Sequence, residues 1–188
     1  MGYYVETIES DFRLSRENYD AAFQSLCELN ARDDLKTGGH YPSNLKRPDS
    51  SQSRGNPNKW FAWMDWNYDE TCHSVTEVLR EAGFELEEDE RGICELWYPY
   101  QKSGQEEFFL GAVAPYVEAG SRIVFEGEDD CRWGYLFDGS RMVECDVSFS
   151  LAPSSYQTTP AAHAEAAKVA SERNENPAEG KRPAIAIK

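Results

Sequence analysis

Acidic residues are concentrated in one block of this chain. Residues 60–150 contain 21 Asp and Glu against 6 Lys and Arg, so the block alone carries a net charge of −15, equal to that of the whole sequence. The block also has the most regular spacing of apolar residues, which identifies it as a folded body and not an acidic tail. Charged side chains are rarely buried without partners, so its carboxylates must lie on the outer faces of helices and strands.

Apolar residues recur at helical spacing in three segments. Two helices are predicted over 16–30 and 71–82, where apolar residues follow the i, i+3, i+4, i+7 pattern. A third helix is predicted to begin at Glu106, whose carboxylate favours a helix N-terminus, and to end at Gly120. Pro115 lies deep within this third segment, so we expect a kink there.

Strands are predicted where polar and apolar residues alternate. Residues 2–10 form the first strand, and 84–87 with 93–98 form a hairpin. Three further strands are expected at 122–126, 132–137 and 142–150. The order of elements predicts an α+β fold, in which about three helices pack on a mainly antiparallel sheet.

Two segments lack this periodicity. Residues 33–58 are rich in Gly, Pro, Ser and Asn, and they are predicted to form a long, flexible polar insertion within a single domain of residues 1–150. This insertion is either a solvated loop, or a mobile lid or partner-binding loop. The tail, residues 151–188, is predicted to be disordered, apart from a weakly apolar helix over Ala161–Arg173.

The segment Lys59–Trp66 contains three tryptophans, Trp60, Trp63 and Trp66. The Gly- and Pro-rich sequence before it and the Asp-Trp-Asn-Tyr run at its end favour a strand that ends in a turn. Both faces of such a strand would be apolar, as in a central strand covered on both sides. The rings either belong to the core or form a solvent-facing aromatic platform that binds a partner.

Two groups of carboxylates are candidate binding residues. Glu85, Glu87 and Glu95 alternate with apolar residues in the predicted hairpin, so they are expected to share its wet face, and Trp97 ends the same hairpin. Such a row of carboxylates is typical of a solvated sheet, but it also suits acid–base chemistry or imitation of nucleic-acid phosphates.

The second group is the run Glu128-Asp129-Asp130, close to Glu126. Carboxylates in a turn can hold a divalent cation, but the spacing and the glycine of an EF-hand loop are missing. We therefore predict a charged turn that can contact a partner, and no metal site.

Cysteine catalysis has little support in the sequence. The five cysteines include no close pair and no matching pair of histidines, which argues against a zinc site and predicts free thiols. Thr71 or Asp69 is expected to cap the second helix. Cys72 is interpreted as a core thiol, although its position near this N-terminus could lower its pKa. Catalysis would also require His40 from the polar insertion to reach Cys72. No phosphate-binding loop is found, and no cofactor is expected.

The N-terminal sequence lacks a basic segment followed by an apolar run, so no secretory signal is expected. No stretch approaches the roughly 20 apolar residues that cross a bilayer. We expect a cytoplasmic protein without a membrane partner. The negative charge also argues against direct binding of nucleic acid.

Both ends of the predicted domain resemble small uncharacterised proteins of bacteriophages and their bacterial hosts. The residues that carry this resemblance are the start Met1-Gly2-Tyr3-Tyr4 and the run Trp133–Val143, which contains a Trp…Tyr-x-Phe-x-Gly-x-(Lys/Arg)-Met hairpin. The resemblance does not extend to residues 31–59 or to the tail. It implies a phage accessory protein that acts inside a bacterial cell, and it implies no catalytic residue.

Together these observations predict a non-enzymatic acidic protein that binds, and inhibits or redirects, a host protein with a basic surface. One alternative is a small enzyme with a carboxylate or Cys/His site under the 33–58 loop. Another is a virion or assembly component, which would self-associate. The sequence leaves the oligomeric state open.

Overall fold

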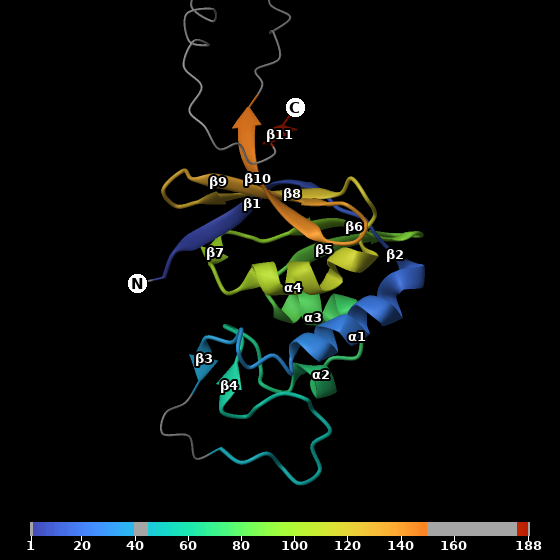
Figure 1. The fold of residues 1–188 in the computed structure, drawn as a ribbon, viewed down its shortest axis with the longest axis vertical. Helices are drawn as coiled ribbons and strands as arrows, with labels where there is room; N and C mark the ends of the chain where they lie inside the picture. Colours follow the sequence, from blue (N-terminus) through green and yellow to red (C-terminus); the bar gives the residue numbers. More distant parts are fainter. Residues whose placement is uncertain (1, 40–44, 150–183, 188) are drawn as a thin grey trace, which may run out of the picture.

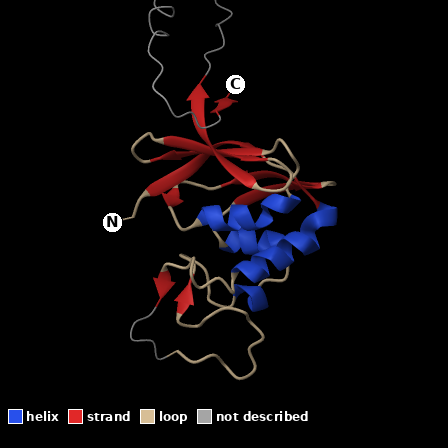
Figure 2. Cartoon of the chain, in the orientation of Figure 1, coloured by secondary structure: helices blue, strands red, loops and turns tan. Residues whose placement is uncertain are grey.

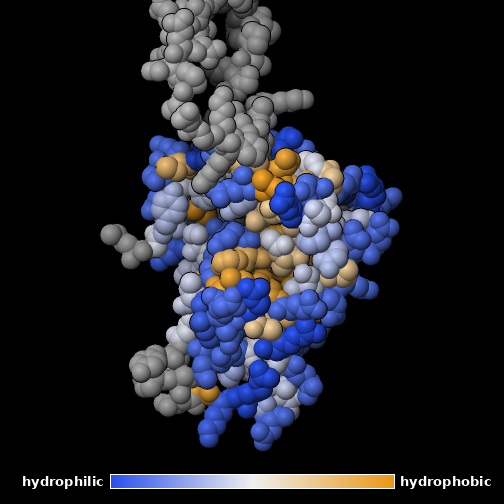
Figure 3. Space-filling view, viewed as in Figure 1, coloured by the Kyte–Doolittle hydropathy of each residue, from blue (hydrophilic) through white to orange (hydrophobic). Residues whose placement is uncertain are grey.

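The protein is built in three layers, which Figure 1 shows as strands above, helices in the middle and a small lobe below. The computed structural model describes residues 2–39, 45–149 and 184–187. Figure 2 shows that the lobe consists mostly of loop with one short strand pair. In the view of Figure 3 the lobe is mainly hydrophilic, whereas apolar side chains gather over the helical layer.

The upper layer contains a six-stranded sheet. Its strands are β1 (Tyr4–Asp11), β7 (Gln101–Lys102), β8 (Arg122–Gly127), β9 (Arg132–Phe137), β10 (Met142–Phe149) and β11 (Ala184–Ile187). Their order is β11-β10-β9-β8-β1-β7. All neighbours are antiparallel except β10 and β11, which are parallel. The predicted α+β class and mainly antiparallel sheet are confirmed.

A second sheet adjoins the first along β1. It has the order β2-β6-β5, formed by β2 (Leu14–Ser15), β6 (Gly92–Trp97) and β5 (Glu85–Asp89), so the predicted hairpin is confirmed. The Thr7 amide donates to the Tyr98 carbonyl oxygen at 2.8 Å, and the Tyr98 amide donates to Thr7 Oγ1 at 2.9 Å. The β1–β8 register shifts between Thr7 and Glu9, which lets β1 contact the strands of both sheets.

Helices cover one face of the sheets. The predicted helices correspond to η1 (Arg16–Asn18) with α1 (Tyr19–Leu29), to α3 (Val75–Glu81), and to α4 (Glu106–Val113) with η2 (Ala114–Tyr116). The regular helix ends at Val113, before Pro115, as expected for a proline that cannot continue it. Leu26, Leu79 and Phe109 are buried in the core against strand residues such as Leu96.

The N-terminus of α3 differs from the prediction. The expected cap at Thr71 or Asp69 is wrong, because these residues lie in the separate short helix α2 (Tyr68–Thr71). Ser74 caps α3 instead: its Oγ accepts from the Glu77 amide at 3.2 Å. Glu77 Oε2 in turn accepts from the amide of His73, the residue before the cap, at 2.7 Å, so the helix begins one turn later than expected.

The aromatic segment also differs. Only Lys59–Trp60 form a strand, β4, which pairs with β3 (Gly38–Gly39). The predicted strand therefore does end in a turn, but its expected continuation as far as Met64 is wrong. The chain turns after Phe61, with the Met64 amide donating to the Phe61 carbonyl oxygen at 3.1 Å. The next residues cannot continue a strand because Trp63 has a φ of 67°.

The C-terminal tail is described only at its end. The helix predicted over Ala161–Arg173 lies outside the described residues, as does most of the segment predicted to be disordered. Ala184–Ile187 form β11, a strand that the apolar spacing did not predict.

Candidate functional site

The sheets have one face that turns away from the helices, and we call it the open face. Val5 on β1 and Leu96 on β6 belong to the core beneath the sheets. Because side chains alternate along a strand, their neighbours Tyr4 and Glu95 lie on the opposite face. The open face therefore carries side chains from both sheets where β1 and β6 lie together.

Four of the predicted binding residues meet on the open face of the β5–β6 hairpin. Glu85 lies opposite Trp97, and Glu87 lies opposite Glu95, so the predicted sharing of one face by the three glutamates is confirmed. The Trp97 indole Nε1 donates to Glu95 Oε2 at 2.7 Å. Among the described residues, none of the three glutamates forms an ion pair with a basic side chain. We call Glu85, Glu87, Glu95 and Trp97 the acidic face.

A group of exposed aromatic side chains lies at the end of the open face, and we call Tyr4, Trp63 and Tyr100 the aromatic cluster. The rings of Tyr4 and Tyr100 are stacked, with centroids 5.2 Å apart and an interplanar angle of 18°. Trp63 is 60% exposed and Tyr100 is 59% exposed. With Gln101 and Lys102 these residues line a shallow cavity of about 370 Å³. The arrangement offers flat apolar surfaces to a partner.

Trp63 reaches the aromatic cluster because its turn is anchored on both sides. Phe61 is fully buried, and its ring packs edge-on against Phe109 at 5.3 Å. The Trp63 ring lies across Gly104, where a Cβ would come within 2.3 Å of Trp63 Cδ1. A larger residue at position 104 would therefore displace the indole. The local spacing of apolar residues predicts neither the conformation of this turn nor the close approach of the indole to Gly104.

The other two tryptophans do not join the aromatic cluster. Trp60 is half-buried in β4, where its ring lies against Gly38. Trp66 is also half-buried, and its carbonyl oxygen accepts from Asn30 Nδ2 at 2.9 Å. Both residues belong to the lobe, so the three tryptophans do not form one platform.

The run Glu128-Asp129-Asp130 forms an exposed turn between β8 and β9 that is tied to the N-terminal strand. The Glu128 amide donates to the Tyr4 carbonyl oxygen at 2.9 Å, and the Tyr3 hydroxyl donates to Asp129 Oδ1. The hydrogen bond to Asp129 raises the pKa of Tyr3 to about 12 and lowers that of Asp129. This acidic turn therefore adjoins the strand that supplies Tyr4 to the aromatic cluster.

Glu126 does not belong to this exposed group, because it forms an ion pair with Arg132. Within the described part of the chain, no group of three or more His, Cys, Asp or Glu side chains is placed to hold a metal ion.

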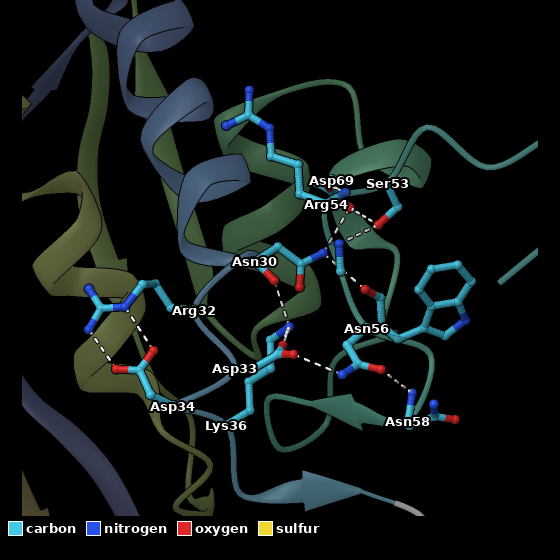
Figure 4. Close-up of polar contacts among 12 residues, drawn as sticks. Asn30, Arg32, Asp33, Asp34, Lys36, Ser53, Arg54, Asn56, Asn58 and Asp69 are labelled. Atoms are coloured by element: carbon cyan, nitrogen blue, oxygen red, sulfur yellow. Dashed lines mark hydrogen bonds and ion pairs between the residues drawn. The ribbon is translucent and has the colours of Figure 1, made fainter. Parts of the chain in front are cut away.

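The described parts of the polar insertion are held by a network around two carboxylates, Asp69 and Asp33 (Figure 4). Asp69 accepts from Asn30 Nδ2 at 2.8 Å, from Ser53 Oγ, and from the Arg54 amide at 2.6 Å. These bonds attach the second half of the insertion to the end of α1 and to α2.

Asp33 organises the other half of the network. Its carboxylate accepts from Lys36 Nζ at 2.9 Å and from Asn56 Nδ2 at 2.8 Å. Burial acts to raise the pKa of Asp33, but these two hydrogen bonds outweigh it and lower the pKa. The Lys36 side chain is fully buried, and its Nζ also donates to the Asn30 carbonyl oxygen at 2.6 Å. Paired and hydrogen-bonded in this way, the buried ammonium group fixes the start of the insertion.

Cys72 does not have the environment of a nucleophile. It lines a surface cavity of about 480 Å³ with Asp65, Thr71, Glu77, Arg80 and Glu81, and this lining includes none of the described residues of 33–58. Burial and the nearby Glu81 carboxylate raise the pKa of the Cys72 thiol, as expected for a thiol at the edge of the core and opposite to the lowering that a helix N-terminus could cause. Its predicted partner, His40, lies outside the described residues.

Within the described ranges, no helix has the length and apolar composition required to cross a membrane. Comparison of the chain with protein-family models, with curated proteins and with solved structures found no match.

Proposed function

We propose that this chain is a non-enzymatic binding protein that docks a basic protein partner on its open face. The observation that carries this proposal is the acidic face: three glutamates without a basic partner among the described residues surround one indole on a rigid strand pair. Carboxylates without a basic partner attract Lys and Arg side chains of another protein, and the indole supplies contact area and cation–π energy.

The other charges of the open face support this choice of partner. Arg122, the basic residue at the start of β8, is occupied by Glu9 at 2.7 Å and by Asp11 at 3.4 Å. Glu6 has no ion pair among the described residues. The negative charge of the face is therefore not neutralised from within, and the field of a −15 protein speeds the encounter with a basic surface.

The aromatic cluster supplies the short-range part of the contact. Trp63, Tyr100 and Tyr3 are three of the four large apolar side chains that are exposed among the described residues. All three lie near the start of β1, beside the acidic turn. Exposed aromatics next to carboxylates suit a partner surface with basic residues around an apolar centre. In a phage accessory protein, as the sequence resemblance implies, the partner would be a protein of the bacterial host.

The test is capture from a bacterial lysate by the immobilised full chain, at about 50 mM and about 150 mM NaCl, with identification by mass spectrometry. The triple variant Glu85→Gln, Glu87→Gln, Glu95→Gln removes the charge of the acidic face and keeps the shape of its side chains. We expect it to lose basic proteins that the unchanged chain retains, with the larger loss at the lower salt concentration.

A matched variant tests whether capture depends on where the carboxylates lie or only on the net charge of the protein. Glu17→Gln, Asp20→Asn and Glu28→Gln remove the same number of charges from exposed positions on η1 and α1. This variant should retain the same proteins as the unchanged chain. Docking on the acidic face would be refuted if both variants lost the same captured proteins to the same extent, or if every captured protein bound the two variants equally well.

A further inference from the structure

The last long strand of the main sheet extends beyond its neighbour. β10 runs from Met142 to Phe149, but β9 pairs only with its first part, as far as Asp146. Figure 1 shows β10 rising above the sheet with β11 at its side. Residues Val147–Phe149 therefore have β11 as their one strand neighbour among the described residues. The outer edge of β10 is the side that turns away from β9; β11 occupies it at Asp146–Phe149, and its backbone amides and carbonyls can pair with another strand in the same way.

The strand that occupies this edge is short. Ala184–Ile187 pair in parallel with Asp146–Phe149, residue for residue. Each backbone hydrogen bond contributes only about 1 kcal/mol net, and the chain must close a loop of 34 residues, 150–183, to form them. The pairing is therefore favoured by only a small free energy, and a competing strand can replace it.

The sequence of the occupying segment shows which chemistry the edge accepts. The Ala-Ile-Ala-Ile strand is flanked in the sequence by Lys181, Arg182 and Lys188, with no acidic residue between them. β10 contributes an exposed carboxylate at Asp146, which is the residue opposite Ala184. The edge thus combines strand pairing with a preference for basic flanks.

We propose that the outer edge of β10 is a strand-acceptor site for an extended apolar segment with basic flanks in the partner protein. The chain's own C-terminal segment fills this site until the partner replaces it. The basic character of the partner rests on the proposed function, whereas the acceptor site itself rests on the β10–β11 pairing. The partner would add a parallel strand to the sheet in place of β11.

The test uses a labelled peptide with the sequence of residues 181–188 and the full chain with the changes Ile185→Pro and Ala186→Pro. Alternate amides of a strand face the same neighbour, so two consecutive prolines remove a pairing amide in either register. The variant should bind the peptide about tenfold or more tightly than the unchanged chain, in which the site is occupied. Hydrogen exchange at Asp146–Phe149 should accelerate in the variant and slow again when the peptide binds.

Two controls make the outcome decisive. A peptide that carries the same two prolines keeps the charge but cannot pair, so it should not bind. The full-chain variant Val147→Pro, Ser148→Pro leaves the β9-paired part of β10 intact and should not bind either peptide. Thermal unfolding monitors the fold of each variant. Equal binding by both peptides, equal binding by the opened and unchanged chains, or no binding at all would overturn the acceptor site.

The result is independent of the acidic face. The variant Glu85→Gln, Glu87→Gln, Glu95→Gln should leave the peptide affinity of the opened chain within about twofold, because these residues lie in the other sheet. Failure of the peptide to bind would leave docking on the acidic face standing, and failure of the capture experiment would leave the acceptor site standing.

Discussion

A single side chain, that of Gln105, connects the polar insertion to the helical layer. Its Oε1 accepts from Thr37 Oγ1 at 2.9 Å and from the Ala62 amide at 3.1 Å, and its Nε2 donates to the Leu35 carbonyl oxygen at 2.6 Å. The residue has a φ of 81° just before α4 begins. The backbone of Gln105 thus adopts an unfavourable conformation. In this position its side-chain amide group links the start of α4 to Leu35 and Thr37 and to Ala62.

Replacing Gln105 by Ala should lower the free energy of unfolding by about 1–3 kcal/mol, because these three hydrogen bonds are lost and the half-buried Ala62 amide is left without this partner. Gln105→Gly removes the same bonds but relieves the left-handed backbone, so it should cost about 1 kcal/mol less. Urea unfolding measures both values. Equal stability of the Ala variant and the unchanged chain would contradict the connecting role of Gln105.

The hydrogen bond between Tyr3 and Asp129 has a spectroscopic consequence. Because Asp129 raises the pKa of Tyr3 to about 12, Asp129→Asn should lower it towards the ordinary value near ~10. The stabilising effect of this bond is present at neutral pH and is lost as the pH rises towards about 12. NMR titration of labelled tyrosine measures the shift. Asp130→Asn should leave the Tyr3 titration nearly unchanged, and the same shift in both variants would rule out the specific bond.

At the scale of elements, the regular spacing of apolar residues predicted most helices and strands. The exceptions are segments whose conformation depends on contacts with residues distant in the sequence. β1, α1 and the β5–β6 hairpin follow from residue spacing, because each has one buried side. The Lys59–Trp66 segment has apolar residues at both odd and even positions, so spacing could not distinguish a strand from a turn. The structure buries Phe61 and Met64 and leaves Trp63 outside, a choice that depends on distant Gly104.

The N-terminus of α3 gives a test at this scale. Ser74→Ala removes the hydroxyl that accepts from the Glu77 amide, and it should lower the free energy of unfolding by about 1 kcal/mol. Thr71→Ala, at the position that the sequence favoured, should change stability by less than about 0.5 kcal/mol, because Thr71 is exposed in α2. Chemical denaturation of the two variants decides which residue caps the helix.

At the scale of the whole molecule, the position of the surplus charge could be predicted from the sequence, but the carboxylates that remain without a basic partner could not. Asp89 is bound by Arg13 at 2.8 Å, and Glu88 lies within 3.9 Å of Arg16 and 3.7 Å of Arg80. Glu85 and Glu87, on the same strand, have no such partner among the described residues. Arg13 and Arg16 come from elements distant in sequence, so residue counts alone could not separate neutralised from available charge.

The available charge makes stability dependent on salt. Raising NaCl from about 20 mM to about 300 mM screens repulsion among the carboxylates, and it should raise the midpoint temperature of unfolding by about 2–4 °C. The variant Glu85→Gln, Glu87→Gln, Glu95→Gln has less repulsion to screen, so its midpoint temperature should rise by less. Calorimetry at both concentrations gives the comparison, and an unchanged or lowered midpoint would show that repulsion on the acidic face is negligible.

The lobe has a practical consequence for work on this protein. Leu45–Ser50 are all exposed, and the network at Asp69 fixes the chain soon after them. Extending a surface loop costs little free energy, so an epitope or a fluorophore-labelling sequence inserted near Asp49 should leave folding intact. Figure 1 places the lobe beneath the helical layer and the strands above it. A label there would report on the protein without covering the open face or the C-terminal strand.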